Sequence, residues 1–510
     1  MSLTIETRYG RVRGASERGV QTYRGLPYAR APLGPLRFRP PLPPRPWDGV
    51  RDCREFAVAA PQNASRWPSL SQGPTRVGEN CLCLNIWTPG LDGEPKPVLV
   101  WLHGGDFVEG SASEPGLNGR ALARRGDLVV VTVQYRLGAL GFLDLGLVAP
   151  GRANLALLDQ IAALEWVRDE IDAFGGDPTN VTLAGSGAGA GCAAALAGMP
   201  RARGLFRSAI LQSPVLQLWE HEQGTEVART LLQELGLAST ADSMDLDLLP
   251  TDQVLAGQRR CEQYLGHASN GRVFRPVVDG AILPKAPIAA AAAGDARSVR
   301  LMVGTNLDEA RLAAIEDATA LDLSESELVA RCVALIPGRD RPERARSLID
   351  TYRGARLGTA ATPSSIWFAI ESDRIFRHPA MQLAQAQAAQ GGPVFAYLFC
   401  WPSPALGGAL GAFHGLEVPF VFGTRRHHSL SRFLEGGDEA KELSHRISDA
   451  WIAFARSGDP SSPGLGRWPA YTAPEHKTLM LGAKPEIVDG PLEAERTIWD
   501  ELGGAQESRT

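Results

Sequence analysis

Short, continuous apolar runs alternate along the chain with longer segments in which apolar residues recur at helical spacing. Runs of this kind, bounded by Gly, Asp or Pro, are typical of strands buried on both faces. Five of them are predicted strands: 98–102, 128–133, 181–184, 301–303 and 394–399. Within 157–174, one helical face collects Ile161, Leu164, Ile171 and Phe174. Strands that alternate with helices over this length predict an α/β fold with a large, mostly parallel or mixed sheet flanked by helices.

Composition limits the classes of partner. The chain has 510 residues, of which 44% are hydrophobic and 21% are charged, as expected of a globular protein with a sizeable core. The net charge of −5 is too mild to indicate nucleic acid or an anionic membrane as partner. The sequence has neither an apolar leader segment nor a run of 18 apolar residues, so we expect a cytoplasmic protein. The seven scattered cysteines fit free, mostly buried thiols, and no metal or cofactor is expected.

Candidate chemistry follows three of the predicted strands, and a fourth segment supplies a histidine. The segments are "VWLHGGDFVEGS" (100–111), "VTLAGSGAG" (181–189), "LMVGTNLDEA" (301–310) and "GAFHGLEVPFVFG" (411–423). In α/β sheets, functional groups come from loops at the carboxyl ends of strands. The order of a glycine-rich loop, a tight strand-to-helix turn, an acid and a histidine is the order found in α/β-hydrolases.

These motifs, with "ENCLCLNIWTP", "VTVQYRLGALGFL" and "WIAFARSGDP", resemble the type B carboxylesterase and cholinesterase family over about residues 4–499. The resemblance implies an α/β-hydrolase fold: a large central, mostly parallel (mixed) sheet flanked by helices, with an N-terminal β extension, in a single domain 1–510. It also implies that Glu309 is the acid and His414 the base, with the carboxylate fixing the orientation of the imidazole.

The turn after the third predicted strand departs from the family pattern D-P-x-N-V-T-L-x-G-E-S-A-G. Gly187 stands at the position of the nucleophile, and Ser186 stands at the position of the glutamate. Catalytically silent relatives such as the neuroligins resemble this chain in carrying the same G-S-G-A-G turn. A register shift by one residue would make Ser186 the nucleophile. The register of the strand and the glycines at 185 and 189 instead favour Gly187 at the apex, which would turn Ser186 away from His414.

The oxyanion loop departs as well. The family usually has H-G-G-G or H-G-G-A, whereas here Asp106 follows Gly105. The backbone N–H groups of Gly105, Asp106 and Ala188 can still converge on an oxyanion, because a side chain does not remove its own amide donor. An ionised Asp106 would oppose that negative charge, and an unpaired carboxylate is costly to bury. We therefore expect Asp106 to contact His414 or a water above Gly187.

Three functions are compatible with these residues. The first expectation is a reassigned site, in which His414 and Asp106 act as a non-covalent acid/base pair in a lyase, cyclase, isomerase or decarboxylase. Its substrate would be a small carbonyl- or ester-bearing metabolite. The second is a carboxylic ester hydrolase that uses Ser186 or a water activated by His414. The third is a non-catalytic ligand- or protein-binding member of the family. Trp219 resembles the wall of an acyl pocket and is a candidate substrate contact, although core packing explains it equally well.

Overall fold

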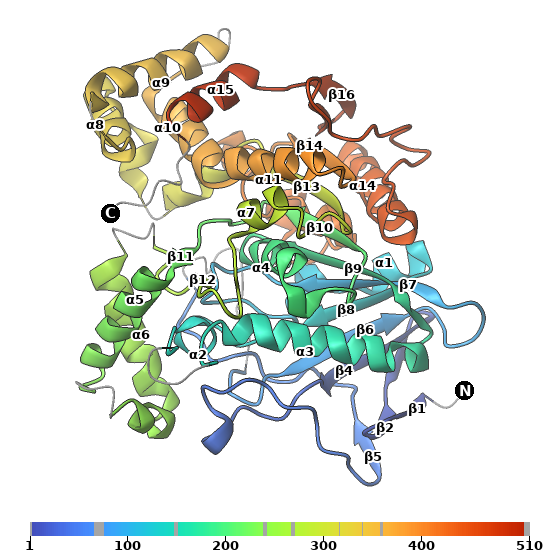
Figure 1. Ribbon diagram of the computed structural model, residues 1–510. Coiled ribbons are helices and arrows are strands. Elements are labelled where there is room, and N and C mark those ends of the chain that lie inside the picture. The colour runs from blue at the N-terminus through green and yellow to red at the C-terminus, as the bar shows by residue number, and fades with distance from the viewer. Residues whose placement is uncertain are drawn as a thin grey trace.

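The computed structural model describes residues 3–65, 76–146, 151–237, 242–266, 271–315, 317–338, 340–356 and 361–503. A sheet of eleven strands runs through these residues (Figure 1). In spatial order its strands are β16 (Glu486–Asp489), β15 (Lys477–Leu481), β14 (Val394–Phe399), β13 (Arg300–Asn306), β10 (Ser208–Gln212), β9 (Gly176–Ser186), β7 (Lys96–Leu102), β8 (Val129–Val133), β6 (Cys83–Thr88), β4 (Val20–Pro27) and β3 (Ala15–Glu17). Neighbouring strands from β15 to β8 pair in parallel, and the outer pairs are antiparallel. The predicted α/β-hydrolase sheet, mostly parallel and mixed, is confirmed.

Apolar residues of a central strand serve both faces of this sheet. In β7, Val98, Val100 and Leu102 join one hydrophobic cluster, and Leu99 and Trp101 join a second. Successive side chains of a strand point to opposite faces, so a continuous apolar run is required where helices cover both sides. This explains why the buried strands could be recognised as uninterrupted apolar runs.

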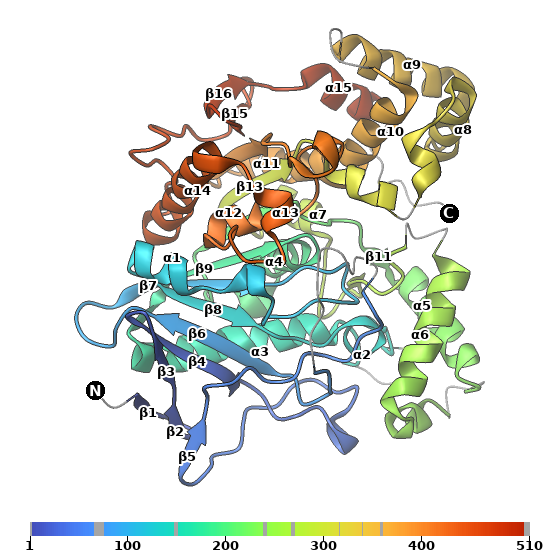
Figure 2. The same ribbon diagram turned by 180° about the vertical axis from the view of Figure 1, so that it is seen from behind.

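Helices cover the two faces. On the face seen in Figure 1 lie α3 (Leu155–Glu170), α4 (Ala188–Gly198), α7 (Pro287–Ala292) and α11 (His378–Ala389). On the opposite face, seen in Figure 2, lie α1 (Arg120–Gly126), α12 (Val418–Phe422), α13 (Ser431–Leu434) and α14 (Gly437–Ser457). The predicted helix 157–174 corresponds to α3 and the 3-10 turn Ile171–Phe174.

The remaining elements surround this framework. An N-terminal three-stranded sheet, as expected from the family, contains β1 (Thr4–Thr7), β2 (Gly10–Arg13) and β5 (Val50–Asp52). A further pair is β11 (Trp219–Glu220) and β12 (Val277–Val278). The other helices are α2 (Gly138–Phe142), α5 (His221–Glu234), α6 (Thr251–Leu265), α8 (Glu325–Leu335), α9 (Arg341–Ala355), α10 (Pro363–Ser372) and α15 (Glu493–Glu501). None of the helices in the described residues has the length and apolar character needed to span a membrane. All seven cysteines are free.

Candidate active site

The sharp turn between β9 and α4 is centred on Gly187. This residue has φ 58° and ψ −119°, with Ser186 as the last residue of β9 and Ala188 as the first of α4. Its N–H donates to the carbonyl of Gln212 at 2.9 Å, and its own carbonyl accepts from the N–H groups of Gly191 at 3.0 Å and Val215 at 3.1 Å. Three backbone hydrogen bonds therefore hold a conformation that residues with a side chain rarely adopt.

Two other glycines allow the turn to pack closely. A Cβ placed on Gly185 would lie 2.6 Å from the backbone carbon of Gly189, and one placed on Gly189 would lie 2.2 Å from the carbonyl oxygen of Leu102. Neither position has room for a side chain. The glycine spacing of the turn thus follows from the close approach of β7, β9 and α4.

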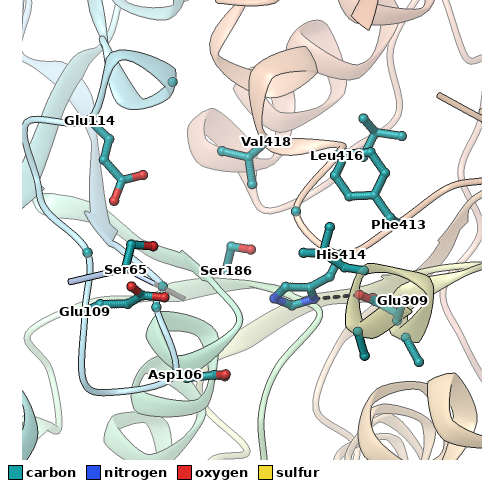
Figure 3. Close-up of a pocket in the computed structure, with 18 of the residues that line it drawn as sticks. Ser65, Asp106, Glu109, Glu114, Ser186, Glu309, Phe413, His414, Leu416 and Val418 are labelled. Carbon is teal, nitrogen blue, oxygen red and sulfur yellow. Dashed lines mark hydrogen bonds and ion pairs between the residues drawn. The ribbon is translucent and has the colours of Figure 1, made fainter. Parts of the chain in front are cut away.

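A histidine and a buried carboxylate face this turn (Figure 3). Nδ1 of His414 donates to Oε2 of Glu309 at 2.6 Å, and the Glu309 side chain is fully buried. Oε1 of Glu309 accepts from the backbone N–H of Asn306 at 2.7 Å, where β13 ends. Because Nδ1 carries the proton toward Glu309, Nε2 is the atom of the neutral ring that can accept a proton.

A second buried carboxylate, that of Glu417, lies behind this pair. Its Oε2 accepts from Nδ2 of Asn306 at 2.6 Å, and its Oε1 accepts from Nε2 of Gln212 at 2.8 Å. Burial and the nearby Glu309 raise the pKa of Glu417, whereas the two amide hydrogen bonds lower it. The sequence prediction missed Glu417, although its position three residues after His414 in "HGLE" was a signal.

The surrounding charges set the basicity of His414. Burial of the ring lowers the pKa of His414, whereas the hydrogen-bonded carboxylate of Glu309 raises it. The negative charges of Glu417 and Asp106 add to the second effect, so that the pKa lies above its usual 6.5. The ring also packs against Phe376, with 4.7 Å between the ring centroids. His414 is thus a fixed and strengthened base.

Ser186 and Gly187 stand in different relations to this base. A Cβ placed on Gly187 would lie 3.0 Å from Nε2 of His414 and 3.5 Å from Cε1. The Ser186 side chain lines the same cavity, and Figure 3 shows its hydroxyl turned into the cavity, with no interaction drawn to His414. In the described part of the chain the Ser186 hydroxyl has no hydrogen-bond partner. A side chain at residue 187, rather than the one at residue 186, would therefore point at Nε2 of His414.

The glycine-rich loop after β7 supplies backbone donors. Gly105 and Asp106 have φ of 108° and 50°, so the loop bends sharply beside the turn at Gly187, which we call the elbow. Within the described residues, the N–H groups of Gly105 and Ala188 donate to no protein acceptor. Oδ1 of Asp106 accepts from Nε of Arg272 at 2.8 Å. The expected contact of Asp106 with His414 or a water stays a prediction, and the structure adds an ion pair with Arg272 that the sequence prediction missed.

A cavity of about 980 Å³ joins these residues. Its walls are largely apolar and include Leu117, Phe368, Phe376, Leu416 and Phe433. Acidic side chains line the part near the oxyanion loop: Asp106, Glu109 and Glu114. Burial raises the pKa of Glu114 to about 7. Among the described residues, no group of three or more His, Cys, Asp or Glu side chains is placed to hold a metal ion.

Trp219 does not line this cavity. Its indole N–H donates to the carbonyl of Val273 at 2.7 Å, and the guanidinium of Arg275 lies 3.6 Å from the centre of its ring. These contacts give the side chain a packing role in β11. Of the residues predicted for the site, the structure thus brings together His414, Glu309, Asp106, Ser186, Gly187, Gly105 and Ala188, and leaves Trp219 outside.

Comparison with known proteins identifies the family. The model of the carboxylesterase family matches residues 1–499. Para-nitrobenzyl esterase of Bacillus subtilis (strain 168) is 36% identical over 500 residues, which cover 96% of this chain and 97% of the relative. Phenmedipham hydrolase of Pseudarthrobacter oxydans is 35% identical and covers 93% and 94%. The crystal structure of carboxylesterase EST55 of Geobacillus stearothermophilus superposes with a TM-score of 0.87 at 37% identity, covering 98% of this chain and 100% of the other.

These relatives correct one expectation. They are named as esterases and hydrolases, so the expected non-hydrolytic lyase, cyclase, isomerase or decarboxylase is wrong, and the hydrolase alternative fits better. The unusual residues Gly187 and Asp106 have to be understood within a framework shared with ester hydrolases. From the family model over residues 1–499 and these relatives, we conclude that the chain belongs to the carboxylesterase family.

Proposed function

We propose that this protein hydrolyses carboxylic esters of small molecules, with His414 as the general base for an attacking water. One observation carries the proposal: Nε2 of His414 lies 3.0 Å from the place where a side chain at residue 187 would begin. The hydrogen bond from Nδ1 to Glu309 leaves Nε2 to receive a proton. A water held between Gly187 and Nε2 would stand where the esterase pattern has its serine.

The reaction follows in two proton transfers. Nε2 takes a proton from the water while the water oxygen bonds to the ester carbonyl carbon, and the carbonyl oxygen becomes an oxyanion. The N–H groups of Gly105, Asp106 and Ala188 would donate to that oxyanion. The imidazolium, stabilised by Glu309, then returns the proton to the departing alkoxide as the C–O bond breaks, which yields an acid and an alcohol.

Ser186 offers a second route to the same products. Its hydroxyl lies in the cavity beside Gly187, and a serine attacking the carbonyl would form an acyl-enzyme that water then hydrolyses. The absence of a hydrogen bond from Ser186 to His414 in the described residues favours water as the nucleophile. The two routes differ in whether a covalent intermediate forms.

The setting of the site guides the choice of substrate. The cavity of about 980 Å³ has mainly apolar walls, so we propose bulky, apolar esters, with para-nitrobenzyl esters as the first probe.

The sheet from β3 to β16 contains strands from residues 15–489, which supports one domain over 1–510. Seven free cysteines support a reducing compartment such as the cytoplasm.

The decisive experiment measures para-nitrobenzyl ester turnover in the wild type, Ser186→Ala and His414→Ala. Water attack predicts turnover that survives in Ser186→Ala and falls by about 10²- to 10⁴-fold in His414→Ala. Loss of turnover in Ser186→Ala, together with a covalent acyl adduct in the wild type, would instead identify Ser186 as the nucleophile. Turnover that does not depend on His414, or a wild type without turnover on a panel of activated esters, would overturn the proposal.

A further inference from the structure

We propose that Arg272 is a positioning residue of the oxyanion loop, which holds the Asp106 carboxylate aside and compensates its charge so that the loop can stabilise an oxyanion. The inference rests on the proposed ester hydrolysis and adds a residue to it. Arg272 lies between α6 and β12, at a distance of 166 residues in sequence from Asp106. Neither the esterase motifs nor the local sequence pointed to it.

Contact and burial define the pair. Nε of Arg272 lies 2.8 Å from Oδ1 of Asp106, and the side chains are 12% and 27% exposed. Both residues line the cavity that contains His414. A hydrogen bond between charged groups that are shielded from solvent is stronger than a surface ion pair, so it can fix the direction of the Asp106 side chain.

The position of Asp106 makes this direction matter. The same residue carries a backbone N–H proposed for the oxyanion hole, so its carboxylate lies only a few bonds from that donor. A carboxylate without a counter-charge would oppose negative charge on the substrate oxygen. It also acts on the base, since the charge of Asp106 raises the pKa of His414. Arg272 reduces both effects at once.

Arg272 is itself held in place by an aromatic contact. Its guanidinium lies 5.8 Å from the ring centre of Phe376, and Phe376 packs against His414 with 4.7 Å between ring centroids. The cation therefore lies along one wall of the reaction centre, between the oxyanion loop and the base. The guanidinium of Arg272 in this position offsets the negative charge of Asp106.

A double-mutant cycle tests the proposal with Asp106→Gly, Arg272→Ala and the double variant. We expect Arg272→Ala to lower kcat/KM for a para-nitrobenzyl ester by about 10- to 100-fold, because the Asp106 carboxylate then opposes the oxyanion without the Arg272 cation beside it. The double variant should return to within about threefold of Asp106→Gly, since the harmful charge is then gone. Additive losses in the double variant would overturn the proposal, because Arg272 would then act independently of Asp106.

The acid limb of the pH profile gives a readout that a loss of packing would not change. The carboxylates acting on His414 are Glu309, Glu417 and Asp106. Arg272→Ala should move the limb to higher pH and Asp106→Gly to lower pH. Arg260→Ala, which removes an ion pair of 2.8 Å with Glu234 outside the cavity, is the matched control and should change neither limb nor rate. An unchanged limb in Arg272→Ala would contradict the proposal.

A second version of the double-mutant cycle tests the role of Arg272 independently of the proposed ester hydrolysis. The same cycle is run in a Gly187→Ser background, with the rate of labelling by a fluorophosphonate as the readout. Labelling requires His414 and the oxyanion loop but no ester substrate. Slow labelling in Arg272→Ala that recovers in the double variant supports the role of Arg272 even if the wild type lacks esterase activity. Failure of all variants to label, Asp106→Gly included, would overturn it.

Discussion

Gly187, at the apex of the elbow, faces Nε2 of His414, although residue 187 has no side chain. The position of a Cβ on Gly187 lies 3.0 Å from Nε2 of His414, while Nδ1 at the other edge of the same ring donates to Glu309 at 2.6 Å. The base is therefore held by a carboxylate on one side and directed at residue 187 on the other. The predictions that follow depend on this alignment.

Replacing Gly187 with serine should create a nucleophile. The Ser hydroxyl would extend from a Cβ already 3.0 Å from Nε2, a contact that requires a shift of the ring by a few tenths of an ångström. We expect a covalent adduct with a fluorophosphonate, detected by intact mass, and a burst of product with activated esters. Because φ of 58° is unfavourable for a residue with a Cβ, the free energy of unfolding should fall by about 1–2 kcal/mol.

Gly187→Ala provides the control for this change. It introduces the same backbone strain without a hydroxyl, so it should lose similar stability and form no adduct. An unlabelled Gly187→Ser protein that is folded would show that the oxyanion donors or His414 are not competent.

Replacing Glu309 with glutamine should weaken His414 as a base, while a side chain of nearly the same size still fills the position of Glu309. Glu309 accepts from Nδ1 of His414 and from the N–H of Asn306, and glutamine can keep only part of this pattern. Ester turnover should fall by about 10²- to 10⁴-fold. Glu325→Gln, at an exposed carboxylate paired with Arg353, should leave kcat unchanged. Equal kcat in the wild type and Glu309→Gln would exclude Glu309 from the mechanism.

The pH dependence follows from the raised pKa of His414. The neutral imidazole is the base, so kcat/KM should decline as the pH falls through a pKa above 6.5. For stability the sign is opposite: a pKa raised by folding stabilises the folded state when the histidine is protonated. This contribution is complete below the unfolded pKa of about 6.5 and disappears as the pH rises through the folded pKa. Urea unfolding of the wild type and His414→Gln at several pH values measures it, and parallel curves for the two proteins would contradict the assignment.

Replacing Glu417 with glutamine should weaken the buried hydrogen bonds behind the His414–Glu309 pair. A Gln side chain would place its NH₂ group against a donor of Asn306 or Gln212, which leaves one buried donor unpaired. The free energy of unfolding should decrease by about 1–3 kcal/mol. Loss of the Glu417 charge should also lower the pKa of His414 and move the acid limb of kcat/KM to lower pH. An acid limb at the wild-type pH would show that Glu417 is uncharged in the resting protein.

Local patterns account for much of the framework. The five predicted strands all belong to the central sheet, because each apolar run had to fill both faces. Strand β10 was missed because its sequence "SAILQ" has only three apolar residues between polar ends, although all five are buried. In the structure, Ser208 and Gln212 lie inside, and Gln212 bonds to both Glu417 and Trp451. A buried polar residue such as Gln212, held by side-chain hydrogen bonds, breaks the apolar pattern on which strand prediction depends.

Contacts between distant segments account for what could not be predicted at the site. The family pattern located His414 and Glu309, and the glycine spacing located the turn at Gly187. The partner of Asp106 could not be found in this way, since Arg272 becomes its neighbour only through the tertiary fold. Its neighbour Arg275, of the same residue type, instead stacks on Trp219. Which arginine reaches the cavity depends on three-dimensional packing rather than on composition.

The elbow keeps its backbone conformation although glycine replaces the serine of the family pattern at position 187. The N–H of Gly187 donates to the carbonyl of Gln212, and its carbonyl accepts from the N–H groups of Gly191 and Val215, so all three hydrogen bonds use backbone atoms. The geometry of the turn is therefore a property of the scaffold and does not depend on the chemistry of residue 187. Any side chain at position 187 would begin next to Nε2 of His414. Substitution of Gly187 by serine, cysteine or aspartate would therefore place a hydroxyl, a thiol or a carboxylate beside this base. A substitution at this one position would therefore change the group that faces His414 while the backbone contacts of the turn stay in place.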